Sequence, residues 1–472
     1  MLHWARARAE LDLSGAGSAA EVAERVGRFH RARSETGPIV GRGWDANGWS
    51  EPPARTALDA ACESRPVLLY SRDHHNLWLN GAALATLGIG RDTPDPDGGV
   101  VGRDAAGEPT GILREHAMRL AAPLEQTHPD ADLARLRGAI AALHACGITA
   151  IHDFEGRDAH RLLRRLAAGD GPRVRTLMSV PHAQLDAAIA VGLETGAGDA
   201  WFRLGAVKLF ADGTLGSRTA ALLEPYDGTN ETGMDLLAPR ELADQVRHAV
   251  EHGWSVAIHA IGDRAVRSAL DALEAVRERL AAVSLPPRLE HVQLLDPKDG
   301  PRFGALGVAA SMQPIHCVSD IPLAERWWGS RRERSYPWRS LLESGARLAF
   351  GSDAPVEPPS AALGLAAALT RRAPGSARAY VPEQAIDLDA ALTAYTETPA
   401  RLAGTWPRLG SLEVGAEADL VAWNVDLHAQ APDALAAAHP VATVLGGRLV
   451  HEAPHAPEAA VAVSGSRVER CP

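Results

Sequence analysis

The sequence predicts an α/β fold whose larger part is a (β/α)8 barrel of the TIM type. Short apolar runs rich in β-branched residues alternate with longer stretches rich in Ala, Leu and Arg at helical period, which is typical of a parallel sheet covered by helices. Most of these runs follow one another at the spacing of one β-helix-β step, about 30 residues in a barrel. The chain has 472 residues, enough for a barrel-sized domain and a smaller one.

Seven barrel strands are expected from this pattern. Each is an apolar run that ends in turn residues or passes into a helical stretch. A closed barrel of this type has eight parallel strands, so the first strand is expected to be missing. The expected strands are residues 147–154 and 173–180, the runs around Lys208, His259 and His291, and the runs that end at Gln313 and Asp353.

The domain organisation follows from changes in composition. Residues 1–404 are predicted to form the barrel domain, and the stretch from 36 to about 125 has clusters of turn residues in place of the barrel rhythm, so we interpret it as an insertion. Residues 405–452 change to short alternating strands separated by Gly-containing turns, which predicts a small β-domain. Residues 453–472 are rich in Ala and Pro and are predicted to be a loose tail.

Charge and hydropathy argue against several classes of partner. The net charge of −11 offers no basic footprint for phosphates, so a nucleic-acid partner is not expected. No stretch is long and apolar enough for a membrane span, and the N-terminus lacks the apolar core of a secretory signal, so we expect a cytoplasmic protein. The four cysteines lie far apart with no C-x-x-C pair, which favours neither a zinc ribbon nor a disulfide framework.

Four ionisable residues stand at or near the ends of predicted strands: Lys208, His259, His291 and Asp353. Because buried ionisable groups are costly unless they pair or bind a metal, we expect these side chains to share one site at the carboxyl ends of the strands. Two imidazoles, a carboxylate and a lysine suit a divalent ion such as Zn²⁺. Such an ion acidifies water, and the carboxylate can move a proton to a leaving nitrogen, so this pattern indicates hydrolytic chemistry.

Each of these residues also has a structural interpretation. A single histidine in a strand is more often held by hydrogen bonds than used as a ligand. For Lys208 the alternative is an ion pair with a nearby carboxylate such as Asp212. The shared-site interpretation is favoured because all of them stand at strand ends with barrel spacing.

Several longer segments resemble, in order, the signature segments of amidohydrolase family 3, the YtcJ-like proteins. They include RGWDANGW, VKLFADGTLGSRTAALLEPY, IHAIGDRAV, LEHVQLLDP, FGSDAPVEPPS and GSLEVGAEADLVAW, and the similarity extends from near residue 10 to about 450. Such a series is far more specific than any one motif. The resemblance implies a TIM barrel joined to a β-sandwich built from both chain ends, hydrolysis of a C–N bond in an amide or similar group, and a divalent metal site, usually zinc, with one or two ions.

The resemblance also assigns roles to individual residues. It makes His259 and His291 metal ligands on the fifth and sixth barrel strands. Asp353 matches the carboxylate after the eighth strand, which acts as general base and counts among the ligands. Lys208 matches the lysine of the fourth strand, which relatives can carboxylate to bridge two metals; whether it is modified here cannot be read from sequence.

The sequence departs from the family pattern at its start. Relatives carry an H-x-H pair at the end of the first strand, and Met1 falls where the residue after the second His would stand, so the pair and the upstream half of the sandwich are missing. The small β-domain is therefore expected to be incomplete. Two explanations are a start codon assigned too far downstream, which the intact remaining motifs favour, and a true truncation; upstream codons for an H-x-H or a stop would separate them.

Further candidates lie in loops. His75 (with Asn80), Trp44 (with Asp45) and Arg218 are weaker predictions for substrate binding, and each has a structural role as its alternative. His152 and Asp153 could pair behind the site, or form a satisfied pair in the core.

The sequence thus predicts a metal-dependent hydrolase that cleaves a non-peptide C–N bond of a small molecule, with Asp353 as the catalytic residue. One alternative is a truncated or non-catalytic relative with an incomplete metal site. Another is an isomerase or C–O hydrolase on the same scaffold, because a fold does not fix the chemistry. A small-molecule substrate is expected, and a homodimer is one option for the assembly.

Overall fold

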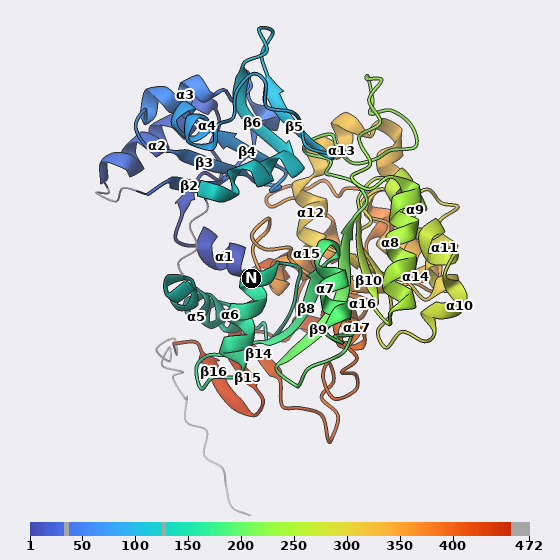
Figure 1. Cartoon of the computed structure of the whole chain (residues 1–472). Coiled ribbons are helices and arrows are strands. Elements are labelled where there is room, and N and C mark those ends of the chain that lie inside the picture. The colour runs from blue at the N-terminus through green and yellow to red at the C-terminus, as the bar shows by residue number, and fades with distance from the viewer. Residues whose placement is uncertain (33–36, 125–128, 455–472) are drawn as a thin grey trace, which may run out of the picture.

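The computed structural model describes residues 1–32, 37–124 and 129–454. Three sheets organise these residues: a six-stranded mixed sheet near the N-terminus, a seven-stranded parallel sheet, and a three-stranded antiparallel sheet near the C-terminus. Figure 1 shows them as an upper lobe in blue and teal, a central body in green to orange, and a small red sheet below.

The seven-stranded sheet confirms the seven strands predicted from sequence. Every neighbouring pair is parallel, and the strand order is β13-β12-β11-β10-β9-β8-β7. Within the described ranges β7 and β13 do not pair with each other, so the sheet curls as part of a TIM-like barrel that is open on one side. The strands are β7 (Ala150–Asp153), β8 (Arg175–Pro181), β9 (Phe202–Phe210), β10 (Val256–Ala260), β11 (Arg288–His291), β12 (Ala309–Met312) and β13 (Arg347–Phe350).

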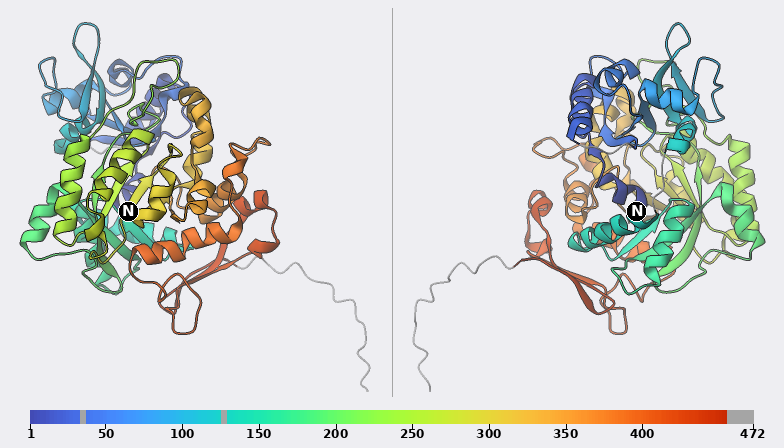
Figure 2. Two further views of the ribbon diagram at one scale, coloured as in Figure 1. Left: turned by 90° about the vertical axis from the view of Figure 1, so that its right-hand side faces the viewer. Right: turned by 60° about the vertical axis from the view of Figure 1, so that its left-hand side comes forward.

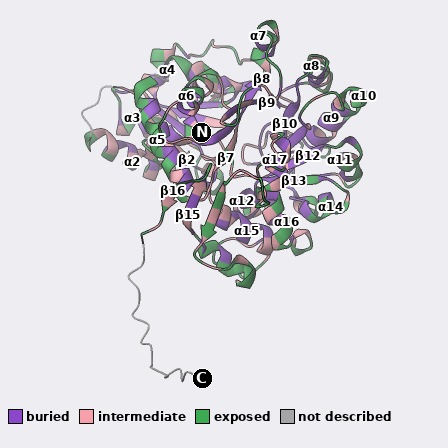
Figure 3. Ribbon diagram, turned by 90° about the horizontal axis from the view of Figure 1, so that it is seen from below, coloured by how far each residue is buried: buried purple, intermediate pink, exposed green. Residues whose placement is uncertain are grey.

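Amphipathic helices cover the outer face of this sheet, as the purple strands inside a ring of green-sided helices show in Figure 3. In α8 the apolar residues Leu242, Val246, Ala249 and Val250 recur at helical spacing and are all buried, while charged residues face solvent. The covering helices include α5 (Pro129–Ala145), α6 (Arg157–Ala167), α7 (Leu185–Ala190), α8 (Pro239–Glu251), α9 (Asp263–Glu274), α10 (Arg277–Leu280), α11 (Gly300–Leu306), α14 (Trp338–Glu343), α15 (Ala361–Thr370), α16 (Leu388–Tyr395) and α17 (Glu397–Leu402).

The six-stranded sheet, with the helices packed on it, forms what we call the N-terminal lobe. Its order is β1-β2-β3-β4-β6-β5, and it holds its own core around Trp78 and Leu69. The sheet begins at β1, upstream of the insertion predicted from residue 36. The domain boundaries given in the sequence analysis remain predictions. The lobe consists of β1 (Leu11–Asp12), α2 (Ala19–Ala32), β2 (Ile39–Trp44), α3 (Arg55–Ala61), β3 (Val67–Ser71), β4 (Asn76–Leu79), α4 (Gly81–Leu87), β5 (Gly99–Arg103) and β6 (Pro109–Glu115).

The lobe stands over the carboxyl ends of the barrel strands. Two helices of the barrel rise toward it, α12 (Pro314–Ser319) and α13 (Ile321–Trp327), which follow β12 (Figures 1 and 2). The short helix α1 (Leu2–Ala7) packs on the other side, against α5, where the guanidinium of Arg6 binds the buried carboxylate of Asp132. The lobe and the barrel therefore enclose a space between them.

The C-terminal sheet contains β14 (Leu420–Trp423), β15 (Pro440–Leu445) and β16 (Arg448–Glu452) in antiparallel order. It is fixed to the barrel by the guanidinium of Arg175, whose Nε lies 2.7 Å from Asp419, and by the Thr443 hydroxyl, which donates to the carbonyl oxygen of His144. The tail predicted at 453–472 lies outside the described residues from position 455 onward. Among the described helices, none has the length and apolar character needed to cross a membrane.

Candidate metal centre

A cavity of about 2080 Å³ opens at the carboxyl ends of the barrel strands. Its wall comes from the barrel, the N-terminal lobe, helix α1 and the C-terminal sheet. All of the residues that the sequence singled out for the site line it, namely Lys208, His259, His291, Asp353, His75, Trp44 and Arg218. The structure therefore brings all of these side chains to one cavity, where each has its own contacts.

Strand register directs two of the predicted side chains inward. Lys208 on β9 lies opposite Ala257 on β10, and His259 lies opposite Glu290 on β11. Since alternate residues of a strand face the same side, Lys208, His259 and Glu290 all face the barrel interior. His291 follows Glu290 directly and would face outward, but its φ of 77° breaks the alternation and turns it into the cavity.

His259 and His291 are in contact, with their ring centroids 4.5 Å apart. The Nε2 atom of His259 lies 3.1 Å from the carbonyl oxygen of Gly213 and donates to it, which leaves Nδ1 with the lone pair. The Nδ1 atom of His291 lies 2.9 Å from Oε1 of Gln313 and donates to it, which leaves Nε2 with the lone pair. Burial lowers the pKa of His291 to about 3 and that of His259 well below its usual range, so both are neutral at physiological pH.

His316, on α12, is a site residue that the sequence reasoning missed. Ligand atoms of His291, His316 and Asp353 all lie within 4.8 Å of one another, close enough to hold one ion. The only sequence signal is that His316 stands three residues beyond the end of a predicted strand at Gln313, and there it lies on a helix.

Asp353 and His316 form an ion pair. Nε2 of His316 lies 3.4 Å from Oδ2 of Asp353, and Nδ1 lies 3.9 Å from Glu357. Burial alone would lower the pKa of His316, but the bonds to these two carboxylates outweigh it and raise that pKa to about 10. Burial would raise the pKa of Asp353, but the bond to His316 and the neighbouring positive charges hold it at about 2. A cation bound beside His316 would repel its proton and free a ring nitrogen as a ligand.

Lys208 is buried between two aromatic rings. Its Nζ lies 4.4 Å from the ring centroid of Phe210 and 4.9 Å from that of Phe154. Burial lowers its pKa to about 8, against the attraction of Glu290 and Asp353. Among the residues placed by the structure, no carboxylate lies within ion-pair distance of its ammonium. Lys208 therefore does not form the ion pair with Asp212 that was the structural alternative. Asp212 instead accepts hydrogen bonds from the backbone of Ala221, Ile261 and Gly262.

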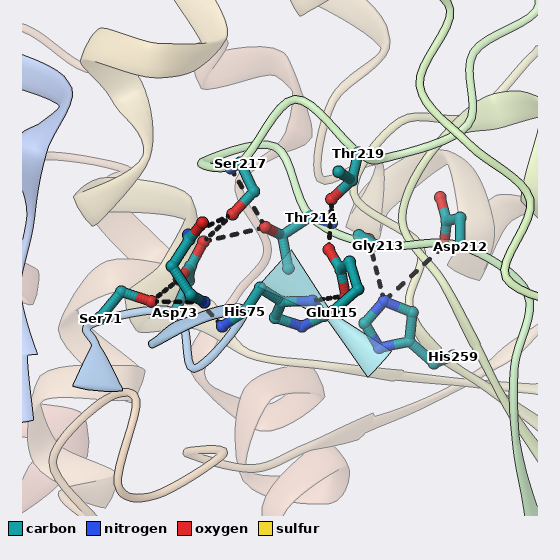
Figure 4. Close-up of polar contacts among 11 residues, drawn as sticks. Ser71, Asp73, His75, Glu115, Asp212, Gly213, Thr214, Ser217, Thr219 and His259 are labelled. Atoms are coloured by element: carbon teal, nitrogen blue, oxygen red, sulfur yellow. Dashed lines mark hydrogen bonds and ion pairs between the residues drawn. The ribbon is translucent and has the colours of Figure 1, made fainter. Parts of the chain in front are cut away.

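His75 reaches the base of the cavity from the lobe, and its ring centroid lies 5.8 Å from that of His259. Figure 4 shows the network that holds it. Nδ1 of His75 lies 2.6 Å from Oε2 of Glu115, and Oε1 of Glu115 accepts from the hydroxyl of Thr219 at 2.6 Å. Burial lowers the pKa of His75, but the charge and hydrogen bond of Glu115 outweigh it and raise that pKa to about 9. The lobe thus contributes an imidazolium beside a candidate ligand.

A second chain of hydrogen bonds joins the lobe to the loop after β9. Asp73 accepts from the hydroxyls of Ser71, Thr214 and Ser217 (Figure 4). Gly213 allows this close approach of lobe and loop, because a Cβ there would lie 2.5 Å from Oε1 of Glu115 in the lobe. The loop that carries the acceptor of His259 is therefore clamped by the lobe.

Other residues named from the sequence have structural contacts. The indole of Trp44 lies in the lobe core and donates to the carbonyl oxygen of Leu69, so only part of it reaches the cavity. Asn80 is fully buried and caps α4. His152 contacts the guanidinium of Arg288, while Asp153 accepts from the amino group of Met1. The side chains of His152 and Asp153 therefore have different partners and do not pair with each other.

The donor set suits a divalent cation. Two neutral imidazoles, each with one nitrogen fixed by an acceptor, are in contact with each other, and the ionised carboxylate of Asp353 lies within 4.8 Å of the ligand atom of one of them, His291. This is the pattern of metal-ligating histidines held by outer hydrogen bonds. His291 and Asp353 also carry positive φ angles of 77° and 56°, a strained conformation that is concentrated at functional sites.

Comparisons with known proteins agree with the motif resemblance. Residues 2–451 match the model of the amidohydrolase family. The chain is 31% identical to the putative amidohydrolase YtcJ of Bacillus subtilis, over 94% of this chain and 85% of that protein. It is 30% identical to the N-substituted formamide deformylase of Arthrobacter pascens, over 79% of this chain and 71% of that protein.

A solved structure shares the fold. An uncharacterized metal-dependent hydrolase from Pyrococcus horikoshii is 30% identical and superposes with a TM-score of 0.70, over 88% of this chain and 82% of that one. The family model covers nearly every described residue, and the relatives support a divalent metal and hydrolytic chemistry. The resemblance found from the motifs is confirmed, and this chain belongs to the amidohydrolase family.

Proposed function

We propose that this protein is a metal-dependent hydrolase that cleaves a non-peptide C–N bond in a small molecule by attack of water. The observation that carries the proposal is the cluster of His291, His316 and Asp353, whose ligand atoms lie within 4.8 Å of one another, with the ring of His259 in contact with that of His291. The unused nitrogens of His259 and His291 each carry a lone pair. The ion is proposed to be zinc, because imidazole and carboxylate ligands suit it. One ion fits beside His291, His316 and Asp353, and a second would require Lys208 in carboxylated form.

When bound, the ion supplies Lewis-acid activation of water and of the amide carbonyl. Asp353 takes the proton of the attacking water as the oxygen adds to the carbonyl carbon, and it returns that proton to the nitrogen as the C–N bond breaks. Its Oδ2 accepts from His316, while Oδ1 has no hydrogen-bond partner among the described residues and faces the cavity. His75, held by Glu115, stands where it can donate to the carbonyl oxygen or the leaving nitrogen.

The relatives make an amide the first class of substrate to test. The deformylase from Arthrobacter pascens acts, by its name, on N-substituted formamides, and the chain covers more than two thirds of it. The three-stranded C-terminal sheet is proposed to be part of a β-sandwich, as in the family pattern. A cytoplasmic location, a homodimer and the absence of nucleic-acid and membrane partners stay predictions.

The experiment is a substrate screen on the purified chain loaded with Zn²⁺. N-substituted formamides, acetamides, cyclic amides and ureas are incubated with the protein, and released amine is quantified. We expect one class to be hydrolysed, with at least about a hundredfold loss of rate in Asp353→Asn, in the range of a lost general base. Exposed Asp244→Asn on α8 is the matched control and should keep full rate.

Two outcomes would contradict the proposal. Turnover that Asp353→Asn leaves intact would remove the assigned base. Substrate consumed without release of amine, as an isomer or by C–O cleavage, would favour the alternative chemistry on this scaffold.

A further inference from the structure

Two arginines flank one indole ring at the mouth of the cavity. The guanidinium carbon of Arg326 lies 4.4 Å from the ring centroid of Trp327, and that of Arg218 lies 5.0 Å from the same ring. All of them line the cavity. They come from different elements, since Arg326 and Trp327 end α13 and Arg218 lies in the loop between β9 and α8. Two positive charges and a flat apolar surface therefore share one place on the wall.

The position of Arg218 is fixed by its neighbours. Its φ of 54° is in the left-handed region, which is costly for a residue with a side chain. The hydroxyl of Ser217 donates to Asp73, and that of Thr219 donates to Glu115, so both adjoining residues are bound to the lobe. Figure 4 shows these two bonds on either side of the turn. These two bonds maintain the strained conformation of Arg218. The conformation places the guanidinium against Trp327.

Among the described residues, a single exposed carboxylate pairs with these two guanidinium groups. Arg218 has one acidic partner, Glu231, at 3.3 Å, and that carboxylate is 59% exposed. Arg326 is exposed, and within the described part of the chain it forms no ion pair. An exposed pair such as Arg218 with Glu231 contributes little, so a ligand carboxylate could displace Glu231 at small cost. The contact with Glu231 also shows that a carboxylate can reach this guanidinium.

We infer that Arg218, Arg326 and Trp327 form a subsite for a carboxylate on the substrate. Arginine binds planar carboxylates through two parallel N–H bonds, and the contacts with the indole of Trp327 hold both guanidinium groups at the cavity wall. The substrate class is therefore an amide that bears a carboxylate. This inference rests on the proposed function for the position of the scissile amide, but the subsite can be tested by binding alone.

The test compares two probes of nearly the same shape, N-acetylphenylalanine, which ends in a carboxylate, and N-acetylphenylalanine amide, which ends in a neutral carboxamide. Their affinities for the purified chain are measured by isothermal titration calorimetry at low salt, and acetate release is followed separately by NMR. We expect the acid to bind at least about tenfold more tightly than the amide, because a hydrogen bond to a charged group changes affinity by about this factor. Arg326→Gln and Arg218→Gln should each reduce this ratio, and the double variant should bring it near one.

Arg247→Gln on α8 is the matched control, because Arg247 is exposed and lies outside the cavity. It should keep the wild-type ratio. The strained position of Arg218 can make Arg218→Gln unfold. Arg326→Gln alters an exposed side chain and should stay folded, so it tests the subsite separately from the fold. A ratio near one in the wild type, or a full ratio in the double variant, would overturn the subsite. Binding preference without acetate release would leave the subsite standing and count against this amide as a substrate.

Discussion

Nδ1 of His291 lies 2.9 Å from Oε1 of Gln313, and this contact decides which nitrogen of the imidazole carries a lone pair toward the cavity. The amide oxygen can only accept, so Nδ1 must carry the hydrogen. Gln313 is buried, and among the described residues that oxygen accepts from no other group. Its position directly after β12 thus links the neighbouring strand to the ligand on β11.

Gln313→Leu is expected to weaken metal binding by about 10- to 100-fold, because His291 loses the acceptor that fixes its tautomer and ring orientation. The measurement is a titration of the chelated protein with Zn²⁺ against a competing indicator. Gln384→Leu is the control, since Gln384 is on the surface and bonds Ser340. Unchanged affinity in Gln313→Leu would mean that His291 is not oriented by this bond.

Gly213→Ala is expected to disturb the site from the loop side. The new Cβ would lie 2.1 Å from Oγ1 of Thr219 and 2.5 Å from Oε1 of Glu115, so the loop that carries the acceptor of His259 must shift. Overpacking of this kind costs about 1–3 kcal/mol. We expect a lower melting temperature and weaker metal affinity, measured by calorimetry and metal titration.

Gly138→Ala is the matched glycine control. Gly138 lies inside α5, and a Cβ there meets no atom within 4 Å. Because alanine loses less conformational entropy than glycine in a helix, this variant should be more stable by about 0.5–1 kcal/mol, with unchanged metal affinity. Equal destabilisation of the two variants would show that close packing at Gly213 is not what matters.

The His75–Glu115 pair predicts a pH dependence of stability. The folded pKa of His75, about 9, is above the ordinary histidine value of 6.5, so the imidazolium stabilises the fold fully below pH 6.5. That contribution is lost as the pH rises through 9, and it amounts to at most about 3 kcal/mol. The free energy of unfolding of the wild type should therefore fall relative to that of His75→Asn between these pH values, as measured by urea titration. Parallel pH profiles of the two proteins would show that His75 is not charged in the fold.

The barrel was predictable from sequence because several of its strands, such as β8 and β10, are buried on both faces and contain runs of apolar residues. All seven appear where they were expected, although β7 is shorter than the predicted 147–154 and β9 begins at Phe202. The lobe was not predictable at this level. Its strands β3, β4, β5 and β6 are short, β3 pairs in parallel with β2 and antiparallel with β4, and α4 lies between β4 and β5, so the pattern indicates an insertion without fixing its topology. β1 pairs with β2 from a distant part of the chain, so no local sequence pattern predicts that pairing.

For the site, strand ends were the useful signal. They pointed to Lys208, His259, His291 and Asp353, which meet in one cavity. His316 was missed because it lies on a helix, where a histidine near a strand end looks like any surface residue. The partner of His75 could not be predicted either, because Glu115 is distant in the chain and the two meet only when the lobe sheet folds.

Elemental analysis of the purified chain tests the central claim most directly. The wild type is compared with the double variant His259→Ala, His291→Ala and with the exposed control His428→Ala, all prepared in parallel and measured by ICP-MS. We predict a divalent metal, zinc, at near-stoichiometric level in the wild type and the control, and its loss in the double variant. Wild-type protein that stays free of metal after incubation with Zn²⁺, or a double variant that keeps the full content, would contradict the assignment of these residues as ligands.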